Sequence, residues 1–121
     1  MSLKIMAVDD SASIRQMVLF SLKKTGYEVA EAANGRIALE SLRETQADLV
    51  ITDLDMPEMN GIELTRNLRA LPAYRTVPIV LLTTESAAEK KQDAKSAGAT
   101  GWITKPFTPA QLVSVVEKLL P

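Results

Sequence analysis

The chain has 121 residues, enough for one domain, and we expect residues 1–121 to form a single domain. It contains no cysteine and no histidine, which excludes disulfides, thiolate nucleophiles, imidazole bases and metal sites built on these side chains. With 14 basic and 15 acidic residues the net charge is −1, so we expect no nucleic-acid partner and no membrane-surface partner. No apolar run approaches the ~20 residues of a membrane span and no signal peptide is visible, which favours a cytoplasmic location.

Five short apolar runs alternate along the chain with segments of helical pattern. The predicted strands are Lys4–Val8, Glu28–Ala32, Leu49–Thr52, Pro78–Leu82 and Gly101–Ile103. Repeated strand–helix units predict a parallel sheet with helices on both faces. The first, third and fourth strands are almost continuously apolar and belong in the centre, whereas the alternating second strand and the short fifth strand suit the edges. This pattern favours an α/β fold, the flavodoxin-like doubly wound sheet of strand order 2-1-3-4-5 with five helices.

Several predicted helices begin at recognisable capping residues. Ser13 and Asn60 each stand three residues before a glutamine or glutamate, which is the spacing of a capping box. Thr108 is a candidate N-cap, followed by Pro109 at the first helical position. The predicted helix near Ala87–Ala97 differs, because its apolar residues are alanines and charged residues crowd it. It can bury little apolar area, so we expect it to be held weakly.

Polar side chains follow the predicted strands at their carboxyl ends. Asp9 and Asp10 follow the first strand and Asp53 follows the third, while Thr83 and Lys105 follow the fourth and fifth. In a sheet of this order, ligands bind at that edge, at the switch point between the first and third strands. Three carboxylates so close repel one another unless a cation lies among them, and oxygen ligands favour magnesium, calcium or manganese. A metal, a lysine, a hydroxyl and an aspartate nucleophile are the groups that phosphoryl transfer to an aspartate requires.

Each of these features has an ordinary explanation when it is taken alone. A pair of aspartates after a strand is usually a turn or a helix cap, and the segment MPEMNG is a turn followed by a helix start. Phe107 suits the core, and Trp102 suits half-buried packing. Their occurrence together at the matching strand ends is what favours a functional site.

Four motifs resemble the receiver domain of two-component response regulators, especially the stand-alone chemotaxis (CheY-like) receivers. In chain order they are VDDS, DLVITDLDMPEMNGIEL, PIVLLTTES and AGATGWITKPF. The similarity covers nearly the whole chain. The resemblance implies a signalling switch rather than an enzyme, one that catalyses only its own phosphorylation and dephosphorylation.

The resemblance also implies a phosphoacceptor and a metal site. Asp53 is the implied phosphoacceptor. The implied Mg²⁺ ligands are the side chains of Asp10 and Asp53 and the backbone carbonyl of Asp55, with Asp9 acting through water. Mn²⁺ is expected to substitute for Mg²⁺.

Four further residues receive roles from the same resemblance, and they act in three pairs. Thr83 and Lys105 contact the phosphoryl group, so they join Asp53 as the implied catalytic residues. Thr83 and Trp102 form the implied switch. The peptide bond between Lys105 and Pro106 is implied to be cis, although sequence alone favours trans.

Two positions depart from the chemotaxis pattern. Asp55 stands where many such receivers have asparagine, so it adds negative charge at the mouth of the site and is expected to alter metal affinity or phosphoryl lifetime. Trp102 stands where the switch aromatic is usually tyrosine or phenylalanine. The larger indole leaves its inward movement an open question.

The partners follow from the same resemblance. A histidine kinase or a histidine phosphotransfer protein supplies the phosphoryl group, since this chain has no histidine. The face formed by the fourth helix, fifth strand and fifth helix then binds a downstream protein, either the flagellar motor switch or another phosphorelay component. We expect a monomer. The chain is either a stand-alone regulator or a receiver excised from a longer protein.

Two other classes of protein share part of the pattern. Phosphatases of the haloacid dehalogenase type also place an aspartate nucleophile two residues before a second aspartate, as in Asp53 and Asp55, but they carry the nucleophile on the first strand. Flavodoxin shares the predicted fold. Its phosphate loop follows the first strand, where Asp9 and Asp10 would repel the flavin phosphate.

Overall fold

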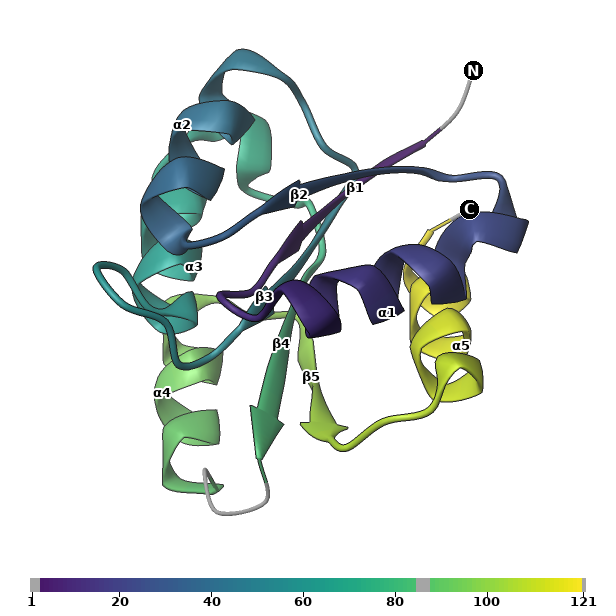
Figure 1. The fold of residues 1–121 in the computed structure, drawn as a ribbon. Coiled ribbons are helices and arrows are strands. Elements are labelled where there is room, and N and C mark those ends of the chain that lie inside the picture. Colours follow the sequence, from purple (N-terminus) through teal and green to yellow (C-terminus); the bar gives the residue numbers. More distant parts are fainter. Residues whose placement is uncertain (1–2, 85–87, 121) are drawn as a thin grey trace.

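The computed structural model describes residues 3–84 and 88–120, and it has the predicted α/β architecture (Figure 1). The strands are β1 (Lys4–Val8), β2 (Glu28–Ala32), β3 (Leu49–Asp53), β4 (Ile79–Thr84) and β5 (Gly101–Lys105). The α-helices in this part of the chain are α1 (Ala12–Leu22), α2 (Gly35–Glu44), α3 (Gly61–Arg69), α4 (Ala88–Ala97) and α5 (Pro109–Leu119). Short 3₁₀ turns are η1 (Lys23–Thr25) and η2 (Pro72–Tyr74).

The five strands form one parallel sheet in the order β2-β1-β3-β4-β5. This confirms the predicted order, with β2 and β5 at the edges. Val8 of β1 pairs with Thr52 of β3, so the two strands that flank the switch point end at the same level of the sheet. The residues that follow them therefore emerge side by side.

Three strands extend further toward their carboxyl ends than their apolar runs predict. β3 includes Asp53, and β4 and β5 pair through Thr83–Thr104 and Thr84–Lys105. The backbone ladder continues through polar residues because a neighbouring strand still offers donors and acceptors there. Asp53, Thr83 and Lys105 are consequently held by the sheet rather than by loops.

The core is divided by the sheet into packed layers. On one face α1 and α5 pack against the strands, and on the other face α2, α3 and α4 do so (Figure 1). Val18 and Leu22 of α1 are buried with Leu112 and Val116 of α5, as their helical spacing predicts. Phe107 is also buried in this layer, which confirms its expected place in the core.

The predicted start of the first helix was wrong. Ser11, not Ser13, is the N-cap of α1, and its hydroxyl accepts a hydrogen bond from the backbone N–H of Ile14 (3.3 Å). The backbone N–H of Ser11 donates in turn to Oδ1 of Asp9 (2.9 Å), so the turn after β1 closes at once and the helix begins earlier. The capping boxes that begin α3 at Asn60 and α5 at Thr108 are both present.

Helix α4 buries only small side chains. Ala94 and Ala97 pack against a cluster made by Leu54, Ile62 and Leu81. The sequence placed the helix from Ala87, which lies outside the described residues. Within residues 3–84 and 88–120, no helix combines the length and apolar character needed to cross a membrane.

Candidate functional site at the carboxyl edge of the sheet

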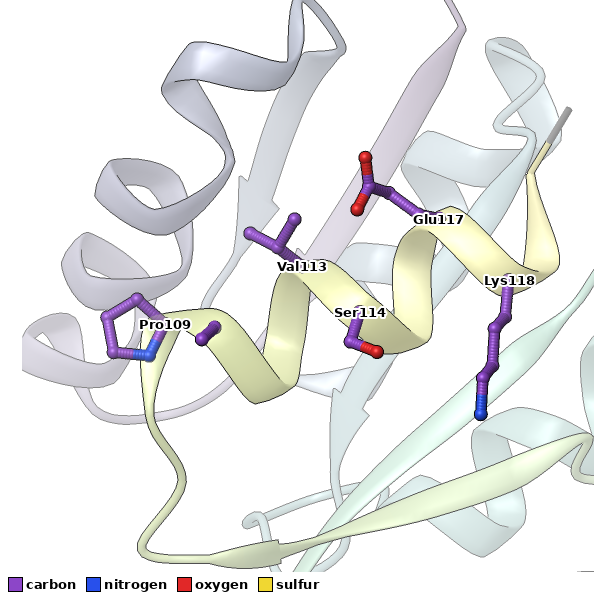
Figure 2. A pocket seen from close by; sticks show the side chains of 6 residues that line it. Pro109, Val113, Ser114, Glu117 and Lys118 are labelled. Carbon is purple, nitrogen blue, oxygen red and sulfur yellow. The ribbon is translucent and has the colours of Figure 1, made fainter.

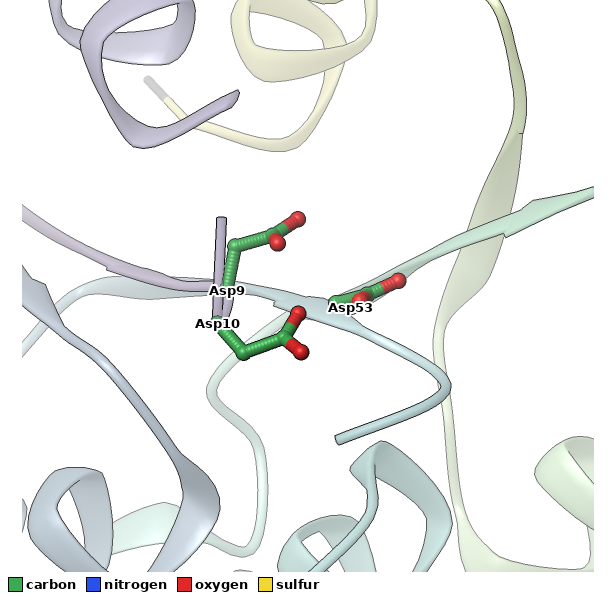
Figure 3. Close-up of side chains that lie close together, drawn as sticks. All are labelled: Asp9, Asp10 and Asp53. Atoms are coloured by element: carbon green, nitrogen blue, oxygen red, sulfur yellow. The ribbon is translucent and has the colours of Figure 1, made fainter. Parts of the chain in front are cut away.

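Three aspartates meet where β1 and β3 end. One carboxylate oxygen from each of Asp9, Asp10 and Asp53 lies within 4.8 Å of the others. Figure 3 shows the three carboxylates projecting to the same side. Asp9 and Asp53 are buried, whereas Asp10 is exposed. The sheet thus gathers the acidic residues predicted from the sequence into one cluster.

Lys105 brings a single positive charge to this cluster from the end of β5. Its Nζ lies 2.8 Å from Oδ1 of Asp53 and 3.5 Å from Oδ2 of Asp9. The peptide bond between Lys105 and Pro106 is cis. One ammonium group faces three carboxylates, so the cluster keeps an excess of negative charge.

Burial dominates the ionisation of these groups. Burial raises the pKa of Asp53, the hydrogen bond and charge of Lys105 act against it, and the charge of Asp10 raises the pKa further. Burial likewise raises the pKa of Asp9, although the hydrogen bond from Ser11 opposes it. For Lys105, burial lowers the pKa, but its contacts with Asp53 and Asp9 together outweigh burial and raise it. Keeping the buried carboxylates ionised therefore costs free energy, and a further cation at the site would reduce that cost.

Two buried oxygen atoms at this edge have no hydrogen-bond partner among residues 3–84 and 88–120. They are Oδ2 of Asp9 and the hydroxyl oxygen of Thr83. Oδ2 of Asp9 has only the long ion pair with Nζ of Lys105 (3.5 Å). Buried polar atoms are almost always hydrogen-bonded, so these two atoms beside a carboxylate cluster indicate a ligand or ion that completes the site. The donor set is all oxygen, which fits a hard divalent cation such as Mg²⁺.

The loop between β3 and α3 is held by a glycine whose role the sequence did not reveal. Gly61 donates its N–H to the carbonyl of Leu54 (2.9 Å), and its Cα faces the backbone carbonyl of Asp53. The motif NG predicted only a turn and a helix start here. The structure adds that a side chain at this position would collide with the residue that carries the candidate nucleophile.

Arg15 is a second residue that pattern analysis missed. Its Nη1 donates to the backbone carbonyl of Asp9 (2.6 Å), and its Nε pairs with Glu31 on edge strand β2 (2.7 Å). The Arg15 side chain is largely buried. The sequence did contain one hint of this role, since an arginine stands one turn into the helix that follows the acidic pair. Only the tertiary structure shows which atoms the arginine contacts.

The side chains of Asp55 and Trp102 lie outside the acidic cluster. The Asp55 carboxylate is exposed and pairs with Lys90 of α4 (3.0 Å). Trp102 is 40% exposed on β5, with Nζ of Lys91 5.3 Å from its ring centroid. The implied metal contact of the Asp55 backbone carbonyl stays a prediction.

The acidic cluster lies at the carboxyl ends of β1, β3 and β5, and two of its three carboxylates are buried. A shallow hollow elsewhere runs along the outer side of α5, where Figure 2 shows Pro109, Val113, Ser114 and Glu117 among its lining. This hollow follows α5 away from the strand ends that carry the aspartates. The candidate site is therefore identified by the convergence of charged groups and not by this hollow.

Comparison with known proteins identifies the family. Residues 5–117 match the family model of the response regulator receiver domain. Chemotaxis protein CheY1 of Helicobacter pylori (strain J99) is 40% identical over 121 residues, covering 98% of this chain and 97% of the relative.

Solved structures agree with this assignment. Chemotaxis response regulator CheY4 of Vibrio cholerae superposes with a TM-score of 0.94 at 46% identity, covering 99% of this chain and all of that chain. The receiver domain of sensor histidine kinase PA1611 from Pseudomonas aeruginosa PAO1, solved with a magnesium ion coordinated in its active site cleft, superposes with a TM-score of 0.89 at 27% identity, covering 98% of each chain. These matches confirm the resemblance seen in the four motifs, and the chain belongs to the response regulator receiver domain family, as a receiver of the CheY-like type.

Proposed function

We propose that the chain is a phosphorylation-controlled switch in which Asp53 accepts a phosphoryl group from a histidine kinase or a histidine phosphotransfer protein. One observation carries this proposal: Nζ of Lys105 lies 2.8 Å from the Asp53 carboxylate, inside the acidic cluster. A lysine at this distance is placed to offset charge on a phosphoryl group joined to Asp53. The unpartnered hydroxyl of Thr83 at the same edge offers a hydrogen bond to the same group.

The proposed reaction is an in-line transfer. A carboxylate oxygen of Asp53 attacks phosphorus, and the new P–O bond forms as the P–N bond to the donor imidazole breaks. The imidazole nitrogen leaves with the electron pair. Lys105 neutralises part of the negative charge that the transferred group brings next to Asp53. We propose no turnover of an external substrate beyond this transfer and the later hydrolysis of the aspartyl phosphate.

The acidic cluster would hold Mg²⁺ for this reaction. The side chains of Asp10 and Asp53 and the backbone carbonyl of Asp55 would bind it, and Asp9 would act through water. Bound Mg²⁺ supplies positive charge against the carboxylates and the phosphoryl oxygens. Two observations support this proposal. Oδ2 of Asp9 has no hydrogen-bond partner among the described residues and only a long ion pair with Lys105, and the Pseudomonas relative was solved with a magnesium ion.

The proposed readout lies on α4, β5 and α5. Thr83 would follow the phosphoryl group, and this movement would bias α4 and Trp102, because α4 is anchored by small alanines. A downstream protein would bind the altered face. Since the relatives at about 40% identity are chemotaxis proteins, the flagellar motor switch is one candidate and another phosphorelay component is the alternative.

A mass measurement tests the assignment of Asp53. Incubation with acetyl phosphate and MgCl₂ should add one phosphoryl mass to the intact protein, and omission of Mg²⁺ should suppress the addition. The Asp53→Asn variant should stay unmodified, while Asp93→Asn, an exposed position on α4, should react like the wild type. Modification of Asp53→Asn at the wild-type rate would show that another residue accepts the group.

The two other classes considered from the sequence gain no support from the structure. A haloacid dehalogenase-type nucleophile belongs on the first strand, whereas Asp53 ends β3 and the carboxylate of Asp55 faces Lys90. In a flavodoxin the loop after β1 binds a phosphate, whereas here it carries the carboxylates of Asp9 and Asp10.

A further inference from the structure

Two consecutive lysines of α4 make contacts in two different directions. Nζ of Lys90 lies 3.0 Å from Oδ1 of Asp55, in the loop that follows the proposed phosphoacceptor. Nζ of Lys91 lies 5.3 Å from the ring centroid of Trp102 on edge strand β5. Helix α4 therefore contacts the loop of the acidic site through one residue and the exposed aromatic through the next.

The helix geometry makes these two contacts interdependent. Successive side chains on an α-helix project roughly 100° apart, so the two contacts together restrict the rotation of α4. The rest of the helix is held by Ala94 and Ala97, which bury little area and resist rotation weakly. A displacement of the loop that carries Asp55 is thus transmitted to the side chain that lies over Trp102.

We propose that Lys90 and Lys91 are positioning residues that link the phosphoacceptor loop to Trp102 through α4. The inference rests on the proposed function of the Asp53 site. In the arrangement that the structure shows, the two lysines hold α4 against the loop and hold Trp102 in its exposed position. When Mg²⁺ and a phosphoryl group draw the loop around Asp53, the contact of Lys90 moves, α4 rotates, and the contact of Lys91 with Trp102 is released.

The expected size of the effect is modest. Both contacts are at least partly exposed, and an exposed ion pair or an exposed cation–π contact each changes an equilibrium constant by roughly two- to fivefold. A link of this size tunes the switch without locking it. By thermodynamic reciprocity, a change at Trp102 must alter ligand affinity at the acidic site as much as the ligand alters Trp102.

The chain carries its own optical probe for this test. It has one tryptophan, so tryptophan emission reports on Trp102 alone. We would titrate the full chain with beryllium fluoride in excess MgCl₂, as a phosphoryl mimic, and follow both the emission and the heat of binding. The variants are Lys90→Met and Lys91→Met, which keep side-chain length and helix propensity but remove the charge. Lys95→Met is the matched control, because Lys95 is exposed on the same helix and its side chain has no ion pair or hydrogen bond with any described residue; only its backbone carbonyl accepts one, from Gly98.

The link predicts three results. Lys91→Met binds the mimic roughly two- to fivefold more tightly than the wild type, because it removes a contact that favours the ligand-free arrangement. Lys90→Met changes the emission of Trp102 before any mimic is added, although Lys90 does not contact the indole. In the double variant the gain in affinity is smaller than the product of the gains of the two single variants, since either substitution alone already frees α4.

Two outcomes overturn the link while leaving the proposed function intact. These are a Lys91→Met titration midpoint equal to that of the wild type and of Lys95→Met, or an unchanged Trp102 emission in Lys90→Met. A wild-type chain that binds the mimic no better than Asp53→Asn overturns the proposed function and this inference with it.

Discussion

Gly61, the first residue of α3, lies directly against the backbone carbonyl of Asp53. A Cβ atom at this position would collide with that carbonyl oxygen and would come within 2.9 Å of Cδ2 of Leu81. The neighbours on both sides are fixed, one by the β-ladder and the other by burial in the core. The close approach of α3 to β3 therefore requires a residue without a side chain.

We expect Gly61→Ala to lower the free energy of unfolding by about 1–3 kcal/mol, because the added methyl group forces α3 or the end of β3 to move. The same displacement should slow the phosphorylation of Asp53. Gly101→Ala is the control, since no atom lies within 4 Å of a Cβ at that position. Urea unfolding and the rate of modification by acetyl phosphate measure both effects, and a Gly61→Ala chain with wild-type stability would contradict the predicted collision.

Arg15 is expected to hold the loop that carries Asp9 and Asp10. Arg15→Gln loses the charged donor to the carbonyl of Asp9 and the ion pair with Glu31, and should cost about 1–2 kcal/mol of stability. It should also weaken Mg²⁺ binding, which calorimetry measures. Glu31→Gln removes only the ion pair and should leave Mg²⁺ affinity close to that of the wild type. Equal losses of affinity in the two variants would show that the contact with the carbonyl of Asp9 has no separate role.

Mg²⁺ should stabilise the folded chain through the acidic cluster. At a concentration ten times its dissociation constant, a cation that binds only the folded state adds about 1.4 kcal/mol to the free energy of unfolding. A melting curve with MgCl₂ should therefore shift upward by several degrees relative to one in EDTA. Asp10→Asn should fold normally, because Asp10 is exposed, but should lose most of this shift. An undiminished shift in this variant would exclude Asp10 as a ligand.

The pH dependence of stability should reveal the buried charge of Asp53. Burial raises its pKa, so the folded chain binds the proton more tightly than the unfolded chain, whose value is near 3.8. The protonated group stabilises the fold below that value, and this contribution is lost as the pH rises through the raised pKa. At neutral pH in EDTA we expect Asp53→Asn to be more stable than the wild type, with the difference shrinking on acidification. Urea unfolding across this range checks the sign, which would be reversed if Lys105 outweighed burial.

Tyr74 offers a change that should affect the fold and leave the chemistry alone. Its hydroxyl donates to the carbonyl of Leu42 (2.6 Å) and accepts from the backbone N–H of Ala47 (3.2 Å), both in the interior. Tyr74→Phe leaves these groups unpaired and should cost about 1–3 kcal/mol. The phosphorylation rate of the folded variant should match that of the wild type, and a selective loss of rate would reveal an unexpected connection to the site.

Much of the fold is predictable from the sequence because a strand that is buried on both faces is an almost continuous apolar run. The apolar runs that end in Val8 and Ile51 predicted central strands. The polar residues that follow these runs predicted the carboxyl edge at which Asp9 and Asp53 meet. Strand ends were less predictable, since residues such as Thr83 remain in the sheet through pairing with a neighbour. Local capping rules also failed at Ser13, where the turn closed by Asp9 and Ser11 starts the helix earlier.

The supporting contacts of the site could not be predicted, because they join residues that are distant in sequence. Arg15 reaches Glu31, Lys90 reaches Asp55, and the reason for Gly61 is a carbonyl eight residues earlier. Each depends on how helices dock on the sheet, and a periodic pattern contains no information about that docking. The sequence motifs identify the reacting groups, whereas the structure is needed to identify the residues that hold them.

Leu3 immediately precedes β1 and packs against the buried cluster that contains Leu120, so residues near both ends of the described chain lie in one layer at the amino edge of the sheet. The aspartates lie at the carboxyl edge, since the strands of the sheet are parallel and run from the amino edge to the carboxyl edge. A polypeptide joined at either end would thus attach at the amino edge, far from Asp53. It would leave the approach of a large phosphoryl donor unobstructed. This polarity separates the acidic site at Asp53 from both ends of the described chain.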